Sequence, residues 1–148
     1  MIMFKVKEAT SKKDFEAILQ LRYEVLRAPW NQTRESATDD LEETSVNAFI
    51  EDENGKVIAC GRLQENENKT GQIRYMAVSK DYQGKGLGRL VVKFLEEKGL
   101  KLQLESIQLQ ARENAVKFYE SCGYSIKEKS FLLWEQIQHF LMEKRLRS

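Results

Sequence analysis

Three glycines within five positions follow an alternating apolar run in the segment RYMAVSKDYQGKGLGR, residues 74–89. Glycine at Gly84, Gly86 and Gly88 leaves backbone N–H groups uncovered. The apolar spacing after them predicts a helix, and the first turn of a helix has N–H groups without intrahelical partners and partial positive charge from its dipole. This loop is therefore suited to bind a phosphate group.

Three phosphate-binding patterns compete for the loop, which consists of Gln83, Gly84, Lys85, Gly86, Leu87 and Gly88. A Walker loop requires GxxxxGK followed by Ser or Thr, whereas Lys85 is followed by Gly86. A dinucleotide fingerprint requires GxGxxG, whereas the spacing here is GxGxG. The third pattern is Gln or Arg, two residues, Gly, one residue, then Gly or Ala. QGKGLG fits it with Gln83, Gly86 and Gly88 at the three specified positions. Lys85 adds a mobile positive charge beside the loop amides.

Length and charge narrow the class of protein. A chain of 148 residues has the size of one domain, and we expect a single domain over residues 1–148. Lys and Arg number 24 against 23 Asp and Glu, so there is no broad attraction to nucleic acid or anionic lipid. No apolar run approaches the roughly 20 residues of a membrane span, and MIMFKVKEAT is too quickly charged for a secretory signal. We expect a cytoplasmic protein that binds neither nucleic acid nor membrane.

The two cysteines, Cys60 and Cys122, lie far apart in apolar contexts. They have neither CxxC spacing nor histidine neighbours, which a metal site would require. We therefore expect two buried thiols and no bound metal.

The apolar patterns predict one continuous unit with an α/β (α+β) fold, in which helices flank a mixed sheet. The expected strands are residues 4–7, 46–51, 57–64, 72–78, 107–111, 125–133 and 138–144. The segment FLLWEQIQHFLME is equally compatible with a helix in place of the last two strands.

Capping residues predict where the helices begin and end. Ser11 should cap the first helix, which should stop near Pro29. The helix that follows the glycine loop should end at Gly99. A short third helix should have Asn114 as its cap and end at Gly123.

The stretch IRYMAVSKDYQGKGLGRLVVKFLE resembles the strand, pyrophosphate-binding loop and helix of the GNAT superfamily of acetyl-CoA-dependent N-acetyltransferases. LQARENAVKFYESCGY resembles the strand and helix that follow, and LRYEVLR and HFLMEK resemble one bacterial branch of small GNAT proteins. Together these segments span nearly the whole chain. The resemblance implies a GNAT-like, mostly antiparallel sheet that splits between its fourth and fifth strands, with acetyl-CoA as co-substrate.

In that superfamily the strand carrying MAV and the next strand splay apart, and the pantetheine arm of acetyl-CoA enters the gap like an added strand. The resemblance implies that Met76, Ala77 and Val78 supply backbone contacts, and that a bulge near Met76 points an N–H at the thioester oxygen. Residues 83–88 would hold the pyrophosphate, and Asn114 would contact the pantetheine arm. From the residues alone, MAV is also compatible with plain sheet core.

Tyr119 matches the position of the family's proton donor, in FYE. A phenol with an unperturbed pKa of about 10 can protonate a thiolate whose conjugate acid has a pKa near 8.5. Tyr119 also shares a helical stripe with Ala115, Phe118 and Cys122, a spacing typical of core residues. The resemblance implies that Tyr119 protonates the departing CoA thiolate and that Phe118 packs beside the cofactor.

The attacking amine must lose a proton, and many relatives place a glutamate on the strand before the glycine loop for this purpose. Gln72 occupies that position here and is not a base, so another group, solvent or an already neutral substrate is required. His139, the only histidine, is a candidate base, and a structural hydrogen bond is its other interpretation. The acidic run from Asp39 to Glu43 either attracts a cationic amine or is a solvated loop.

Residues 21–30 should shape the acceptor side, with Arg22 and Trp30 either lining it or serving as packed structural groups. The resemblance implies direct transfer of the acetyl group, in a ternary complex, to a primary amine of a small molecule or peptide. It also implies a homodimer as one possible assembly. A CoA-binding sensor or partner-binding domain without turnover is the alternative, which the absent glutamate favours.

Overall fold

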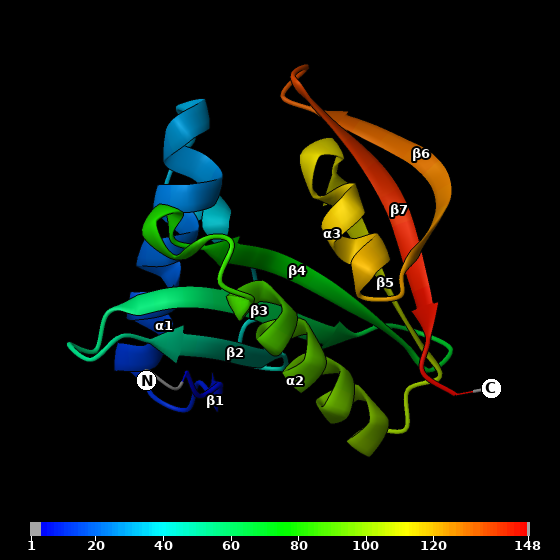
Figure 1. Ribbon diagram of the computed structural model, residues 1–148, viewed down its shortest axis with the longest axis horizontal. Helices are drawn as coiled ribbons and strands as arrows, with labels where there is room; N and C mark the ends of the chain where they lie inside the picture. The colour runs from blue at the N-terminus through cyan, green and yellow to red at the C-terminus, as the bar shows by residue number, and fades with distance from the viewer. Residues whose placement is uncertain (1–3, 148) are drawn as a thin grey trace.

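The computed structural model describes residues 4–147. Within this range seven strands form one sheet in the order β1-β2-β3-β4-β5-β7-β6, and only the β4–β5 pair is parallel. The sheet is thus mixed and mostly antiparallel, as predicted (Figure 1). The strands are β1 (Lys7–Glu8), β2 (Val46–Glu51), β3 (Val57–Glu65), β4 (Thr70–Val78), β5 (Ser106–Arg112), β6 (Ser125–Leu133) and β7 (Ile137–Arg145).

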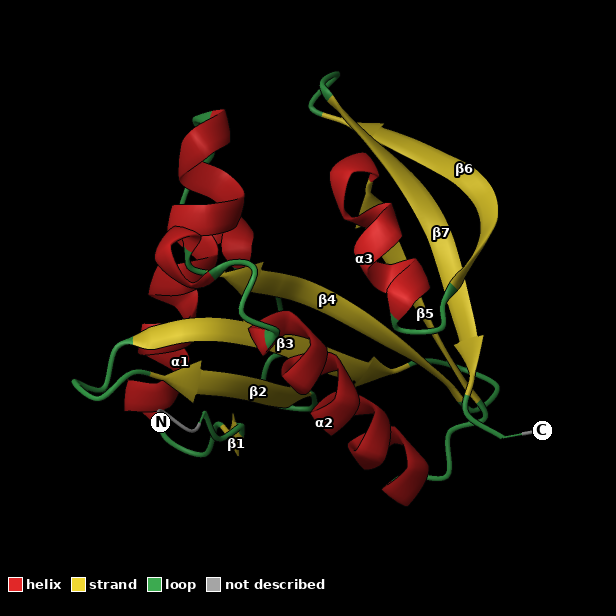
Figure 2. Ribbon diagram, viewed as in Figure 1, coloured by secondary structure: helices red, strands yellow, loops and turns green. Residues whose placement is uncertain are grey.

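Helices cover both faces of the sheet (Figure 2). One face packs against α1 through Ile18 and Leu21, and the other packs against α2 through Val91 and Leu95. Because both of its faces are covered, β3 is buried along nearly its whole length, which explains the continuous apolar run from Val57 to Cys60 at its start. The helices are α1 (Lys12–Arg22), α2 (Leu87–Lys101) and α3 (Val116–Ser121), with the π-helical turn η1 (Tyr23–Arg27) and the 3-10 turns η2 (Ala28–Trp30), η3 (Glu35–Ala37), η4 (Lys80–Tyr82) and η5 (Glu113–Ala115).

The sheet splits between β4 and β5. Residues 70–73 of β4 pair with residues 106–109 of β5, and the pairing ends there. Beyond that point the two strands diverge in Figure 1. Residues 76–78 of β4 therefore have no partner on β5, which confirms the predicted split between the fourth and fifth strands.

A bulge interrupts the pairing of β3 with β4. Cys60 pairs with Ala77 but Arg62 pairs with Arg74, so β4 has one more residue than β3 in this interval. Tyr75, in the bulge, has a φ of 57°, and left-handed backbone is unusual for a residue with a bulky side chain. The predicted bulge near Met76 is confirmed.

Most of the predicted element ends are confirmed. Ser11 Oγ accepts a hydrogen bond from the Asp14 N–H at 3.1 Å. The first helical path continues through η1 and η2 to Trp30, next to Pro29. Gly123 ends α3 with a φ of 97°. β6 and β7 are strands, so the helical alternative for this segment is wrong.

Two predicted helix signals are wrong. Gly99 lies inside α2, which continues to Lys101. The glycine leaves room for close packing there, because a Cβ would lie 3.1 Å from Leu146 Cδ1. Asn114 lies within η5, and neither η5 nor α3 has a side-chain cap among the described residues.

The first strand is shorter and later than predicted. It comprises Lys7–Glu8 rather than residues 4–7. Phe4 and Val6 instead pack against the core, and the Phe4 ring lies edge-on to Tyr82 with ring centroids 6.2 Å apart. Hydrophobic contact has replaced strand pairing at these positions.

The thiols differ in environment. Cys60 is buried, and burial raises the pKa of its thiol to about 11. Cys122 is only half-buried, so the prediction of two buried thiols is correct for Cys60 alone. In the part of the chain that the structure describes, no helix is long and apolar enough to cross a membrane, and no three potential metal-ligating side chains gather at one place.

Candidate active site

A pocket of about 440 Å³ lies where β4 and β5 separate. Met76 of β4 and Arg112 of β5 line it, together with Tyr119 of α3. Arg27 of η1 and His139 of β7 also line it. The split in the sheet therefore brings together side chains from segments that are far apart in the sequence.

The glycine loop has an open backbone at two of its three glycines. Gly84 and Gly86 have φ values of 80° and 82°, and a Cβ at either would meet nothing within 4 Å. Gln83 and Lys85 are also exposed. Gln83 Nε2 donates a hydrogen bond of 3.2 Å to the Val78 carbonyl, which ties the loop to the end of β4. This exposed backbone is a cradle that can accept a ligand.

Gly88 differs from the other two glycines because it is buried in packing. A Cβ at Gly88 would lie 3.0 Å from Phe118 Cζ, so the glycine allows α2 and Phe118 to approach closely. The neighbouring Leu87 is 1% exposed and belongs to the core. Phe118 in turn contacts Tyr119, with ring centroids 5.0 Å apart. The beginning of α2 is thus connected by direct packing to Tyr119.

Tyr119 is 7% exposed and lines the pocket. Its ring packs edge-on against Phe118 and Tyr124. No hydrogen bond to its hydroxyl is formed within residues 4–147. Burial raises the pKa of Tyr119 well above 10, although the charge of Arg112 acts in the opposite direction. The phenol is therefore protonated at neutral pH.

The other predicted cofactor-binding residues occupy different surroundings. Met76 lines the pocket, whereas the Ala77 side chain is buried on the α1 face of the sheet and Val78 packs on the opposite core. Asn114 is exposed and is not among the described residues that line the pocket. The structure therefore brings Met76 and Tyr119 to one cavity and leaves the Asn114 side chain outside it.

Gln72, at the position that the resemblance to the superfamily compares with a glutamate, lines the pocket. Its Oε1 accepts a hydrogen bond from Asn66 Nδ2 at 3.1 Å. The amide therefore takes part in a polar ladder across the sheet, and it offers no group that titrates near neutral pH.

His139 is 5% exposed and also lines the pocket. Its Nδ1 lies 3.0 Å from the Ile137 carbonyl oxygen. Because a carbonyl only accepts, Nδ1 carries the proton and the neutral ring has its lone pair on Nε2. The Phe131 ring stacks on the imidazole at 4.4 Å. Burial lowers the pKa of His139 below 6.5, so the imidazole is neutral at pH 7.

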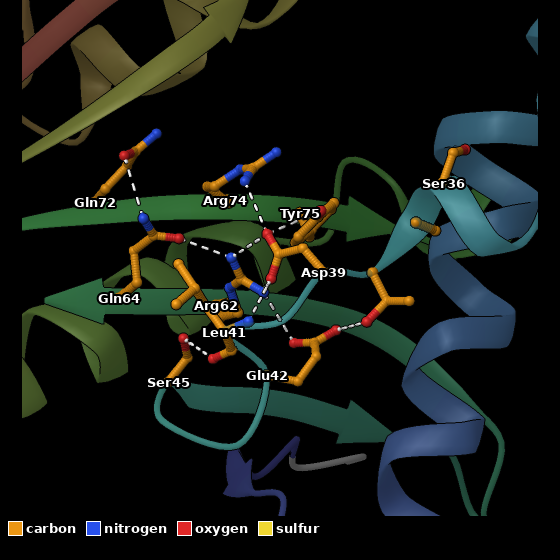
Figure 3. A network of polar contacts seen from close by, with 12 residues as sticks. Ser36, Asp39, Leu41, Glu42, Ser45, Arg62, Gln64, Gln72, Arg74 and Tyr75 are labelled. Carbon is orange, nitrogen blue, oxygen red and sulfur yellow. Dashed lines mark hydrogen bonds and ion pairs between the residues drawn. The ribbon is translucent and has the colours of Figure 1, made fainter. Parts of the chain in front are cut away.

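Two members of the acidic run, Asp39 and Glu42, pair with arginines (Figure 3). Arg62, which is fully buried, donates to Asp39 at 2.7 and 2.9 Å and to Glu42 at 3.1 Å. Arg74 donates to the same Asp39 carboxylate at 3.0 Å. Arg22 also binds Glu42. Asp39 and Glu42 are therefore neither a solvated loop face nor free to attract an amine.

The same arginines surround the bulge. The guanidinium carbons of Arg22, Arg62 and Arg74 lie 4.3, 4.9 and 4.7 Å from the centre of the Tyr75 ring. These cation–π contacts stabilise Tyr75 in its left-handed conformation. Arg22 is 1% exposed, so its role is structural.

Two features of the sequence indicate this network. Arg62 lies in the apolar segment VIACGRL, and a charge that is buried with such a strand requires a partner. Gly61 precedes it in the strand interior, where glycine often marks a bulge or a close approach. A Cβ at Gly61 would lie 2.3 Å from Met76 Sδ. No single segment indicated the pocket arginines Arg27 and Arg112.

Comparisons with known proteins agree with this architecture. The sequence profile of the acetyltransferase (GNAT) family matches residues 15–124. The uncharacterized N-acetyltransferase YjcF of Bacillus subtilis (strain 168) is 26% identical over 136 residues, which cover 92% of this chain and 96% of YjcF.

Solved structures share the fold at lower identity. The ribosomal-protein-S18-alanine N-acetyltransferase from Escherichia coli matches with a TM-score of 0.80 and 20% identity, covering 99% of this chain and 96% of that one. An aminoglycoside 6'-N-acetyltransferase complexed with coenzyme A matches with a TM-score of 0.81 and 12% identity, covering 97% and 98%. The family profile matches most of the length of this chain, and the sheet is split as described above. This chain therefore belongs to the acetyltransferase (GNAT) family.

Proposed function

We propose that this protein transfers an acetyl group from acetyl-CoA to a primary amine, by direct attack in a ternary complex. One observation carries the proposal: a protonated phenol without a hydrogen-bond partner in the described chain faces the pocket in the split sheet, and packing connects it to the open glycine loop. Acetyl-CoA supplies an activated acetyl thioester.

The residues at the split fit this co-substrate. The open amides of Gly84 and Gly86, with Lys85 beside them, suit a diphosphate. Residues 76–78 lack a partner on β5, so their backbone is free to bind the amides of a pantetheine arm as an added strand would. We assign the remaining loop residues, Gln83, Leu87 and Gly88, to shaping this cradle. Asn114 is exposed and is assigned a secondary contact with the arm.

Three groups would divide the chemistry. The Met76 N–H, at the bulge, stabilises the oxyanion that develops during attack. Tyr119 donates its proton to the departing sulfur. His139 Nε2 accepts the proton of the attacking amine, a role that Gln72 does not fill. Neutral imidazole is the required form, and the buried position of His139 maintains it.

His139→Gln should lower kcat/KM by about 10²-fold, because a base is lost while the polar shape is retained. In the wild type, kcat/KM corrected for the fraction of neutral amine should rise with pH through a pKa below 6.5 and then level off, since only neutral imidazole accepts a proton. The variant should lack that inflection. The pH–rate profile is measured with one amine for both proteins. A wild-type inflection retained in the variant would exclude His139 as the base.

Gly86→Val should weaken CoA binding by about 10-fold or more, because a β-branched side chain strains the left-handed backbone and covers the loop amides. Gly55→Val is the matched control: Gly55 has a φ of 83° and equally open surroundings, in the β2–β3 turn. Both variants carry the same backbone strain, so calorimetry with CoA isolates the effect on the loop. Equal affinities would remove the phosphate-binding assignment.

The test of the function is amine-dependent release of free thiol from acetyl-CoA. The solved relatives are named for an aminoglycoside and for a protein alanine, so the fold does not select the acceptor. The panel should therefore include amino acids, polyamines, aminoglycosides and lysine peptides. Thiol release that saturates with one class supports the proposal. Saturable CoA binding without thiol release for any amine would favour a sensor or partner-binding domain instead.

A further inference from the structure

The pocket wall is strongly positive. Arg27, Arg74 and Arg112 line it, and no aspartate or glutamate does so among residues 4–147. Arg74 is neutralised by Asp39, at 3.0 Å. The other two arginines form no ion pair with a carboxylate anywhere in the described chain. A pocket that receives a simple cationic amine would have the opposite charge.

Arg27 and Arg112 converge on one neutral atom. Arg27 Nη1 and Arg112 Nη2 lie 3.2 and 3.1 Å from the same oxygen, the Leu26 carbonyl. Arg27 Nε and Nη2 donate to the Ser36 carbonyl at 3.2 and 3.0 Å. Two guanidinium groups are therefore held side by side by main-chain carbonyls, which orient them without neutralising them.

This arrangement is electrostatically unfavourable in the free protein. Arg27 is 9% exposed, and Arg112 is half-buried. Burial lowers the pKa of both, and the charge of Arg27 lowers that of Arg112 further. A bound anion would relieve both the desolvation and the repulsion, and each planar guanidinium group can donate two hydrogen bonds to the oxygens of a carboxylate or phosphate. Trp134 stacks near Arg27, 5.4 Å from its guanidinium carbon, and restricts its orientation.

We infer that the acceptor amine also carries a carboxylate or phosphate group, which binds between Arg27 and Arg112. The inference rests on the proposed function and adds the class of acceptor to it. Tyr119 and His139 line the same pocket, and Arg112 pairs with His139 across β5 and β7, so an anion held by the two arginines keeps the amine of the acceptor in the cavity that contains Tyr119 and His139. Because the cavity of about 440 Å³ must also hold the acetyl end of the co-substrate, the acceptor is small.

Matched pairs of amines test the inference. Each pair shares its amine and differs in the anion: 4-aminobutyrate against 4-amino-1-butanol for carboxylate, and O-phosphoethanolamine against ethanolamine for phosphate. The kcat/KM values, corrected for the fraction of neutral amine, should favour the anionic member by about 10- to 100-fold. Whichever pair shows the larger ratio identifies the anion.

Arg27→Gln and Arg112→Gln should each reduce that ratio by about 10-fold. Arg112 has a single hydrogen bond to the main chain in the described structure. The Arg112→Gln variant therefore still tests the inference if loss of Arg27 impairs folding. Arg34→Gln is the control, because Arg34 does not line the pocket and, among residues 4–147, forms an ion pair with Glu16 alone. The ratio for this variant should equal that of the wild type. Equal kcat/KM within each pair, or an undiminished ratio in both pocket variants, would overturn the inference.

Calorimetry with the same compounds, with and without CoA, separates this inference from the proposed function. One outcome is that the anionic members bind more tightly, that both pocket variants weaken this binding, and that no thiol is released. This outcome supports the anion site and refutes acetyl transfer to this panel. Thiol release with no anionic preference supports acetyl transfer and refutes the anion site. If the anionic members show no tighter binding and no amine releases thiol, both the anion site and acetyl transfer to this panel are refuted.

Discussion

Tyr119→Phe should lower kcat by about 10²- to 10⁴-fold, the range typical of a lost general acid, with CoA affinity nearly unchanged. The ring is held by Phe118 and Tyr124, so removing one oxygen leaves its packing intact. Without the phenol, the thiolate leaves unprotonated or takes its proton from water. Single-turnover thiol release measures the chemical step directly, and calorimetry measures CoA binding.

Tyr124→Phe is the matched control for this prediction. Tyr124 is 3% exposed and donates a 2.8 Å hydrogen bond to Glu96, but it does not line the pocket among the described residues. Its loss should lower stability by about 1 kcal/mol and change kcat little. If the two variants had the same kcat, the proton would have to come from water or another donor.

Asp39→Ala should lower the free energy of unfolding by about 3 kcal/mol, because it leaves the fully buried Arg62 with only part of its neutralising charge. The same change frees Arg74, which then adds a further unpaired cation beside Tyr75. Asp40→Ala is the control, since Asp40 is exposed. Urea denaturation in one buffer measures the free energy of unfolding of both variants.

The pH dependence of stability gives a second measurement for Asp39. The hydrogen bond from Arg62 lowers the pKa of Asp39 from 3.8 to about 2. A lowered pKa means that the unfolded state binds more protons between these values, so the contribution is complete above about pH 4 and is lost as the pH falls toward 2. The Asp39→Ala variant should lack this part of the acid loss. Equal stabilities of the Asp39 and Asp40 variants would contradict the predicted role.

The parts of the fold that depend on neighbouring residues were predictable from the sequence. Alternating apolar residues gave the strands of the sheet, and the Ser11 cap and the left-handed Gly123 gave helix ends. The errors at Gly99 and Asn114 have tertiary causes. Gly99 packs closely against Leu146, which is distant in the sequence, and the 3-10 turn η5 takes the place of a capped helix start.

The charged half of the site was not predictable because its partners are distant in the sequence. Arg62 meets Asp39 across 23 positions, and Arg112 meets the Leu26 carbonyl across 86. Local patterns report propensity and periodicity, whereas the pairing of two charges depends on how the sheet splits and where η1 packs. The bulge residue Tyr75 and its ring of arginines arise only when these elements are assembled.

The parallel ladder between β4 and β5 comprises only four residue pairs. The sheet consequently has two parts, β1–β4 and β5–β7, joined by these four pairs, with α1 and α2 packed on the first part and α3 on the second. A molecule that lies in the gap would contact both parts and extend the connection between them. Binding in the gap should therefore restrict the motion of one part relative to the other, so that the protein becomes more rigid as more of it is bound.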